Sequence, residues 1–182
     1  MEVTNKSLSS LNFINKNSLK EADIMDEYED PAEWNNKGVD LFNKEDYEEA
    51  VKAYDNALKL DPMIKEVWNN KGNALRLLGR YEESIECFDK AIELSPENFE
   101  PWVNKGATYY DMGDYTSAVE SLNKALEIDP ENSFALNNKG AALANSDNLE
   151  AAMACFEEAL RVDPDDINAQ RNKQILKGIL NR

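Results

Sequence analysis

Four asparagines recur at a constant interval of 34 residues: Asn36, Asn70, Asn104 and Asn138. A primary amide donates a hydrogen bond to a carbonyl and accepts one from an N–H group, so a column of amides could bind a peptide main chain without selecting its sequence. Asparagine is a mediocre helix former, and its return in every copy therefore needs a cause. Inheritance from a recent duplication of one unit is the alternative explanation.

Histidine, the side chain that active sites use most often for proton transfer, is absent from the sequence. The 182 residues include no histidine, which excludes Ser-His and Cys-His nucleophilic pairs and histidine-based proton transfer. The glycines stand singly at repeat positions rather than in a phosphate-binding loop. We therefore predict that the protein is not an enzyme.

The two cysteines, Cys87 and Cys155, occupy equivalent positions of the second and fourth copies, 68 residues apart. Four helix layers at about 8 to 10 Å each would place them far beyond the Cα separation of about 7 Å that a disulfide permits. We expect free thiols. Two distant cysteines without histidine cannot supply the four ligands of a zinc site, so no metal and no cofactor are predicted.

The asparagine column belongs to a longer repeated phrase. Trp-Asn-Asn-Lys-Gly begins at Trp34 and at Trp68, and it becomes Trp-Val-Asn-Lys-Gly at Trp102 and Leu-Asn-Asn-Lys-Gly at Leu136. A fixed period of this length indicates stacked copies of a small unit, because no single copy can bury its own apolar face. The sequence predicts a solenoid whose exposed faces bind something else.

Each period contains two stretches with the apolar spacing of an amphipathic helix. Glycines mark the turn between them at Gly79 and Gly113, and prolines end the second stretch at 62, 96, 130 and 164. The tryptophans are interpreted as packing anchors between units. Glycine inside a helix costs about 0.5 to 1 kcal/mol relative to alanine, so we expect the second helix to lie too close for a Cβ at four positions: Gly38, Gly72, Gly106 and Gly140.

This order of residues resembles the tetratricopeptide repeat, and nearly every signature position matches in four consecutive copies. The resemblance implies an all-α fold, a right-handed superhelical solenoid of antiparallel helix pairs, in which the first helices line a concave groove. The units would span residues 31–64, 65–98, 99–132 and 133–166. The fourth is the least regular, with Leu136 and Leu149 in the places of Trp and Tyr.

The resemblance also implies that the asparagine column faces the groove, where similar superhelices hold a peptide main chain. The predicted peptide-binding residues are Asn36, Asn70, Asn73, Asn104, Asn138, Phe42, Arg76 and Tyr110. Family members that hold acidic chaperone tails do so with basic residues. The corresponding positions here are Asn35, Val39, Asn70, Glu100 and Asn104 or, one unit on, Asn69, Asn73, Asn104, Phe134 and Asn138, and none of them is Lys or Arg. The mixture of amide, apolar and aromatic side chains among the predicted groove residues favours a peptide or helix with apolar anchors over a highly charged tail.

The two terminal segments do not join the repeat. Residues 167–182 carry a helical stripe of Ala169, Lys173, Leu176 and Leu180, and we expect a C-terminal capping helix over unit four.

Residues 1–30 are predicted to form a flexible N-terminal arm with a possible short helix, because Ser18 and Glu21 make a capping-box pattern. The arm also contains Leu8, Leu11, Phe13 and Ile14. It could be a tethered regulator of the groove, a contact with a second molecule, or a tail without contacts.

The net charge of −16 is unevenly distributed. Residues 31–166 hold 29 acidic and 13 basic residues, whereas residues 167–182 hold four basic residues and none that is acidic. An acidic body repels a phosphate backbone, so nucleic-acid binding is not expected. No apolar stretch approaches the roughly 18 to 20 residues of a membrane span, and no secretory signal is visible. We therefore predict a cytoplasmic protein with no membrane contact, as a monomer or weak homodimer.

These observations favour a protein-protein interaction module, an adaptor or co-chaperone-like scaffold that holds a peptide or helical segment of a partner in its concave groove. A structural subunit that uses its convex faces in a larger complex is the first alternative. An accessory that presents substrates to an enzyme is the second.

Overall fold

The computed structural model describes residues 30–181. The predicted N-terminal arm, its short helix and its apolar residues therefore lie outside the described residues, apart from Asp30. Within the described part the chain forms nine α-helices and no strand, which confirms the predicted all-α fold. None of these helices has the length and apolar character needed to cross a bilayer.

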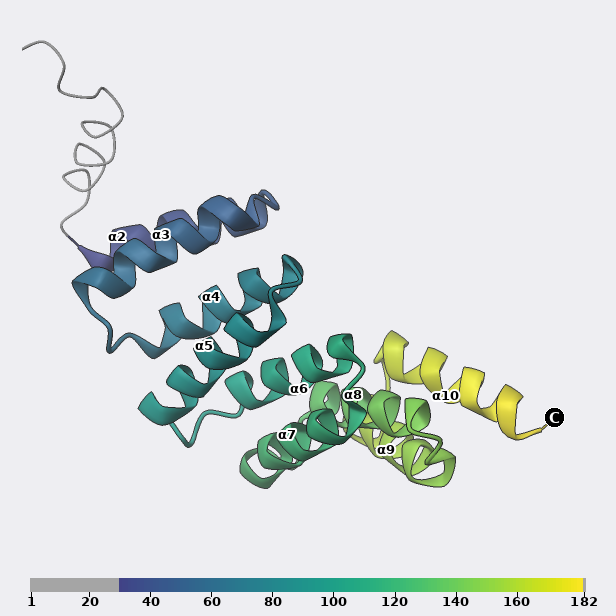
Figure 1. Ribbon diagram of the computed structural model, residues 1–182. Coiled ribbons are helices and arrows are strands. Elements are labelled where there is room, and N and C mark those ends of the chain that lie inside the picture. Colours follow the sequence, from purple (N-terminus) through teal and green to yellow (C-terminus); the bar gives the residue numbers. More distant parts are fainter. Residues whose placement is uncertain (1–29, 182) are drawn as a thin grey trace, which may run out of the picture.

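The helices form four consecutive pairs and a final single helix (Figure 1). The pairs are α2 (Pro31–Asn43) with α3 (Tyr47–Leu60), α4 (Lys65–Leu77) with α5 (Tyr81–Leu94), α6 (Glu100–Met112) with α7 (Tyr115–Ile128), and α8 (Ser133–Asn145) with α9 (Leu149–Val162). The last helix is α10 (Ile167–Leu180). We call α2, α4, α6, α8 and α10 the first helices and α3, α5, α7 and α9 the second helices.

The turn inside each pair requires a left-handed residue at the same repeat position. Gly79 and Gly113 adopt φ values of 74° and 81° there, as the sequence predicted. Units one and four place Glu45 and Asp147 in that conformation, each with φ of 63°. The turn geometry is thus kept even where a side chain makes it less favourable.

The helices of a pair approach so closely that the mid-helix glycines are needed. A Cβ on Gly72 would lie 2.6 Å from Cε1 of Phe88, and one on Gly140 would lie 2.6 Å from Cε1 of Phe156. The predicted close approach is therefore confirmed, although the group that fills the space is mainly a large side chain of the second helix. In unit two, Ser84 adds a hydrogen bond from its Oγ to the Gly72 carbonyl at 2.8 Å.

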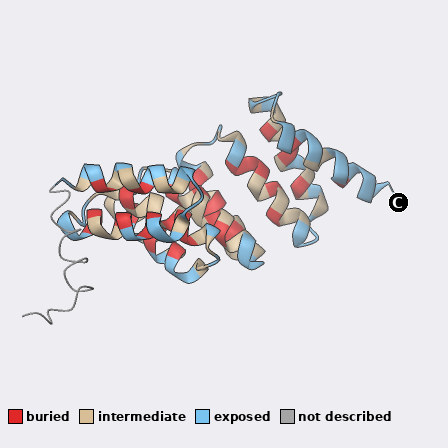
Figure 2. Cartoon of the chain, turned by 90° about the horizontal axis from the view of Figure 1, so that it is seen from above, coloured by how far each residue is buried: buried red, intermediate tan, exposed pale blue. Residues whose placement is uncertain are grey.

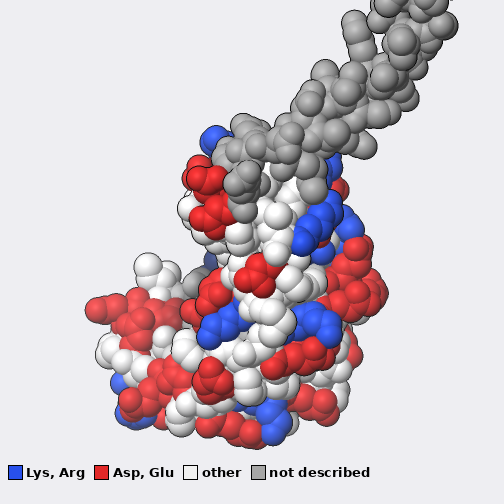
Figure 3. Space-filling model, turned by 90° about the vertical axis from the view of Figure 1, so that its left-hand side faces the viewer, with Lys and Arg blue, Asp and Glu red and all other residues white. Residues whose placement is uncertain are grey.

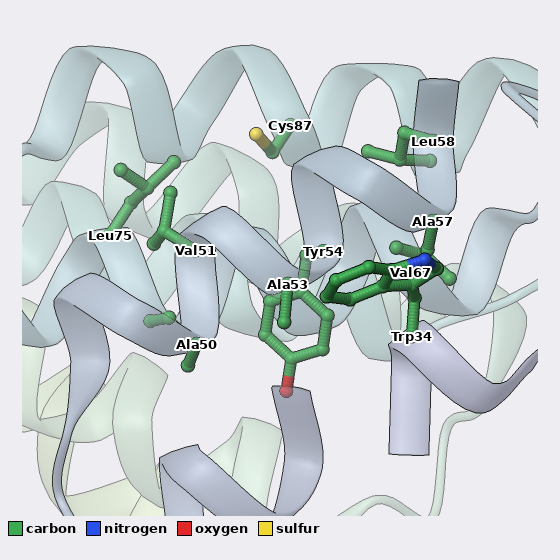
Figure 4. Close-up of a cluster of buried hydrophobic side chains, with 11 residues drawn as sticks. Trp34, Ala50, Val51, Ala53, Tyr54, Ala57, Leu58, Val67, Leu75 and Cys87 are labelled. Carbon is green, nitrogen blue, oxygen red and sulfur yellow. The ribbon is translucent and has the colours of Figure 1, made fainter. Parts of the chain in front are cut away.

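The buried residues lie between the helices, in separate clusters along the stack, with exposed residues outside (Figure 2). In the N-terminal cluster the Trp34 indole and the Tyr54 ring pack among aliphatic side chains of α3 and α4 (Figure 4). Trp68 is half-buried, and its Nε1 donates to the Pro62 carbonyl at 2.8 Å. These contacts agree with the interpretation of the tryptophans as packing anchors.

The first helices lie on the inner side of the curve. Neighbouring first helices contact one another directly along the whole series from α2 to α10. Among the substantial contacts in the described part, none joins two second helices. Helices that touch on one side and diverge on the other produce a curved stack, so the first helices line the concave face.

α10 packs against α8 and α9 at the C-terminal end. Ala169 and Leu176 are buried against unit four, and Lys173 forms an ion pair with Glu157 at 3.1 Å. The prediction for Leu180 was wrong, because this side chain is 47% exposed. All four residues from Lys177 to Leu180 are exposed, so the last turn of α10 is not buried against unit four.

Candidate functional site

The concave face is tied together by hydrogen bonds between asparagines of neighbouring first helices. Asn70 Nδ2 donates to Asn35 Oδ1 at 3.2 Å, and Asn104 Nδ2 donates to Asn69 Oδ1 at 3.0 Å. Asn70 and Asn104 were predicted to lie in the groove, but their pairing with Asn35 and Asn69 was not predicted. Part of the asparagine column therefore joins one unit to the next.

The same asparagine contact continues into α10. Asn172 Nδ2 donates to Asn137 Oδ1 at 2.9 Å. Asn172 was not among the predicted site residues, although it follows Asn138 by one period of 34 residues. α10 is thus placed as the first helix of a fifth unit, and it extends the concave face.

A second row of contacts crosses the first helices closer to their C-terminal ends. Arg76 Nη1 binds Asp111 Oδ2 at 2.7 Å, which neutralises the predicted cation of the groove. Asn145 Nδ2 donates to the Tyr110 hydroxyl at 3.0 Å. Arg76 Nε is buried and has no hydrogen-bond partner within the described residues. Arg76 is therefore held by its neighbour and is not a free anchor for an acidic ligand.

Asn138 differs from the other members of its column. Unit three has Val103 where units one, two and four have asparagine, so the residue that should accept from Asn138 carries no polar atom. Within residues 30–181 the side-chain amides of Asn138 and Asn73 have no hydrogen-bond partner, and both residues are half-buried. These amides remain available to a ligand.

One hollow opens on the concave face near the N-terminal ends of α6 and α8. We call it the phenylalanine hollow; its volume is about 380 Å³, and Asn69, Phe99, Glu100, Val103, Asn104, Asn132 and Phe134 line it. Phe134 is 54% exposed even though it is a large apolar residue. An apolar floor with amide groups at its edge suits an apolar side chain whose main chain is hydrogen-bonded.

A second hollow lies at the C-terminal end of the concave face, between side chains of α6, α8 and α10. We call it the isoleucine hollow; its volume is about 240 Å³, and its lining includes Tyr110, Ala141, Ala144, Ile175 and Ile179. Ile175 is 55% and Ile179 is 51% exposed. Neither isoleucine was predicted as a site residue, because α10 was expected only to cover unit four. The signal that could have found them is the period, since Ile175 and Ile179 follow Ala141 and Asn145 of the same hollow by 34 residues.

Carboxylates are the unpaired charges along the N-terminal edge of this face. Glu66 and Glu100 begin α4 and α6, are exposed, and make no ion pair within the described residues. Acidic side chains are also widespread on the end of the molecule that Figure 3 shows. The concave face therefore offers apolar hollows and amides with an acidic edge, which disfavours an anionic ligand.

The predicted site residues do not form one cluster. Asn104 lines the phenylalanine hollow and Tyr110 lines the isoleucine hollow. Asn36 is exposed, and Phe42 packs its ring 5.3 Å from that of Tyr47. Asn70, Asn73, Arg76 and Asn138 lie on the same face but line neither hollow.

A separate row of lysines lies away from the groove and joins α4 to α3 and α6 to α5. Lys71 binds Asp55 at 2.6 Å, and Lys105 binds Asp89 at 2.5 Å. In unit four the partner position holds Asn123, so Lys139 has no carboxylate there. These pairs have a role in packing and do not contribute to the hollows.

The thiols show no sign of activation. Burial raises the pKa of Cys87 to about 11, and burial also raises the pKa of Cys155. A thiol with a raised pKa is a weak nucleophile at neutral pH. In the part of the chain that the structure describes, no group of three or more Cys, Asp or Glu residues is arranged to hold a metal ion.

Comparisons with known proteins agree with this geometry. A family model described as "Tetratricopeptide repeat" matches residues 31–63, 99–132 and 133–166, and one described as "TPR repeat" matches residues 72–113. The search of curated proteins gave no match.

Several solved structures have the same fold. MamA 41-end from Desulfovibrio magneticus RS-1 is similar with a TM-score of 0.74 and 22% identity, over 83% of this chain and 85% of that one. YrrB, described as a TPR protein with an unusual peptide-binding site, has a TM-score of 0.66 and 24% identity, over 88% and 83%. The first TPR of Spaghetti (RPAP3), bound to the HSP90 peptide SRMEEVD, has a TM-score of 0.62 and 24% identity, over 65% and 94%.

Proposed function

The chain belongs to the tetratricopeptide repeat family, and on this premise we propose that its concave face holds a segment of a partner protein. The single observation that carries the proposal is the pair of apolar hollows on that face. Asn138 lies on α8 between Phe134 and Ala141, which line the two hollows, and its amide has no partner among the described residues. Similar proteins that bind peptides, such as the one bound to an HSP90 peptide, support the same class of function.

The ligand class follows from the chemistry of the face. Exposed Phe134 and Ile175 would contact two apolar side chains of the partner, while amides such as that of Asn138 would hold its main chain. The chain would act as a non-catalytic adaptor or scaffold. Two hollows of about 420 and 440 Å³ lie away from the groove, beside Lys71 and Lys105, and could serve a structural subunit. Neither is lined by an exposed large apolar side chain such as Phe134 or Ile175, so the concave face is the better candidate.

The fit of acidic chaperone tails is poor. The positions that would hold a terminal carboxylate carry Asn35, Val39, Asn70, Glu100 and Asn104, and the nearby cation of Arg76 is already bound to Asp111. A carboxylate would find no charge-assisted partner. We expect a peptide ending in Glu-Glu-Val-Asp to show no saturable binding at physiological salt, and a micromolar complex would contradict this assignment.

The proposal is tested by mapping a partner onto the face. A partner captured with the full chain is purified, and its affinity is measured by titration calorimetry for the wild type, Phe134→Asp and Asn138→Ala. We expect a loss of tenfold or more for Phe134→Asp and a smaller loss for Asn138→Ala, because one hydrogen bond contributes about 0.5 to 1.5 kcal/mol.

Met63→Asp is the matched control, because Met63 is 67% exposed in the turn between α3 and α4. Equal affinity for all variants would exclude the concave face as the binding site. The double variant Asn70→Ala/Asn104→Ala is less informative, since both amides also join neighbouring units, and its affinity has to be compared with its melting temperature.

A further inference from the structure

The two hollows raise the question of what covers them when no partner is bound. Phe134, Ile175 and Ile179 are each more than half exposed, with values of 54%, 55% and 51%. Large apolar side chains that share one concave face and remain open to water usually mark a binding surface. A segment that covers apolar hollows with an acidic edge should combine apolar side chains with positive charge.

The chain contains such a segment outside the described residues. Residues 3–20 hold three lysines and no acidic residue, although the whole chain has a net charge of −16. The same stretch contains apolar residues at Leu8, Leu11, Phe13, Ile14 and Leu19. It is therefore cationic and apolar, and it complements both the carboxylates of Glu66 and Glu100 and the apolar floors of the hollows.

The covalent connection places this segment within reach. Asp30 directly precedes the N-terminal end of α2, and the phenylalanine hollow lies near the N-terminal ends of α6 and α8. Three helix spacings of about 8 to 10 Å separate α2 from α8. The fifteen residues between Ile14 and Asp30 can span about 50 Å when extended.

The spacing of the hollows suits neighbouring apolar residues of the segment. Val103 and Tyr110 line different hollows and are seven residues apart on α6, which corresponds to about 10 Å along a helix. Leu11 and Ile14 are three residues apart, and in a polyproline II conformation, which has three residues per turn, they would lie on the same side of the chain about 9 Å apart.

We propose that residues 8–14 of the same molecule occupy the two hollows and compete with the partner segment. The inference rests on the proposed function of the concave face and adds its regulation. A tethered segment acts at millimolar effective concentration, so even a weak intrinsic affinity keeps the face covered. A partner must then displace the segment before it binds.

The test uses the full chain and a labelled synthetic peptide of residues 3–20. The double variant Leu11→Asp/Phe13→Asp disables the tethered copy, and fluorescence anisotropy measures peptide binding. We expect saturable binding to this variant and at least tenfold weaker binding to the wild type. Adding Phe134→Asp to the variant should abolish peptide binding, whereas adding Met63→Asp should leave it unchanged.

Two results would overturn the inference. Equal peptide affinity for the wild type and the Leu11→Asp/Phe13→Asp variant would show that no tethered copy competes. A wild-type dimer in sedimentation velocity that becomes a monomer in this variant would assign the segment to a second molecule instead.

Partner affinity separates this inference from the proposed function. If Phe134→Asp weakens partner binding while Leu11→Asp/Phe13→Asp leaves it unchanged, the groove binds the partner and the segment does not regulate it. If Leu11→Asp/Phe13→Asp strengthens partner binding, self-occlusion is supported. If Phe134→Asp has no effect on the partner but abolishes peptide binding, the proposed function fails while the segment contact stands.

Discussion

Gly72 provides a quantitative test of how closely the helices of one pair pack. A Cβ at this position would lie 2.6 Å from Cε1 and 2.9 Å from Cδ1 of Phe88, well inside the separation of about 3.5 to 4.0 Å that carbon atoms prefer. The Phe88 side chain is fully buried, so the ring cannot move into solvent. Gly72→Ala must therefore shift α4 relative to α5.

The expected effect is the difference between two opposing contributions. Alanine in a helix gains about 0.5 to 1 kcal/mol over glycine, and an added methyl in a packed core costs about 1 to 3 kcal/mol. We expect Gly72→Ala to lower the free energy of unfolding by about 0.5 to 2 kcal/mol. Gly178→Ala is the matched control, because Gly178 lies inside α10 and a Cβ at this position would meet no neighbouring atom within 4 Å. It should raise the free energy of unfolding by the helix contribution alone.

Thermal and urea unfolding followed by far-UV circular dichroism would measure both variants. One kcal/mol corresponds to about 2 to 4 °C for a chain of this size, so the two melting temperatures should move in opposite directions by a measurable amount. In a double-mutant cycle, Phe88→Ala should remove most of the cost of Gly72→Ala, because the opposing ring is gone. Equal stability of Gly72→Ala and Gly178→Ala, or strict additivity in the cycle, would refute the idea that this contact sets the helix spacing.

Three further outcomes are expected. Deleting residues 167–182 exposes the buried contacts that Ala169 and Leu176 make with unit four, so the truncated chain should melt lower or aggregate; an unchanged melting temperature would mean that α10 contributes nothing to stability. Asn123→Asp should give Lys139 the carboxylate that Lys71 and Lys105 already have and raise the free energy of unfolding by about 0.2 to 1 kcal/mol, whereas no increase would show that Lys139 does not reach this position. Burial raises the pKa of Cys87 from 9.0 to about 11 and that of Tyr54 from 10.0 to about 12. Because both groups bind their protons more tightly in the folded state, the free energy of unfolding should be unaffected by them below pH 9 and should fall between pH 9 and pH 12. Unfolding titrations of Cys87→Ala should lack the first part of this fall.

The repeated phrase in the sequence was sufficient to predict the fold class. Local rules specify one unit. They are the close helix packing at the glycine column, the left-handed turn at Gly79 and Gly113, and the prolines after each second helix. Repetition of the unit then requires stacking, because each copy leaves an apolar face uncovered. The asparagine column and its location on the first helices also followed from the period. The handedness of the superhelix, the unit boundaries and the peptide-binding role of the column remain predictions.

The partners of the groove residues depended on tertiary structure. Asn70 donates to Asn35 and Arg76 binds Asp111 because adjacent first helices touch along the concave face, and this contact joins residues one period plus one position apart. No pattern inside one unit encodes that offset, since it results from how two helices from different units are aligned against each other. For the same reason a single valine, Val103, deprives the amide of Asn138 of its acceptor one unit later.

The hollows were likewise decided only by the folded chain. The sequence alone determined that the chain is a stack of helix pairs, that it lacks histidine chemistry, and that its body is acidic. Only the tertiary structure showed that α10 contributes Ile175 and Ile179 to the concave face and that Phe99 and Phe134 from different units lie around one hollow. The physical reason is that periodicity reports which residues share a face of one helix. A hollow forms between helices, and its shape depends on the helix spacing and on the sizes of side chains that separate units contribute.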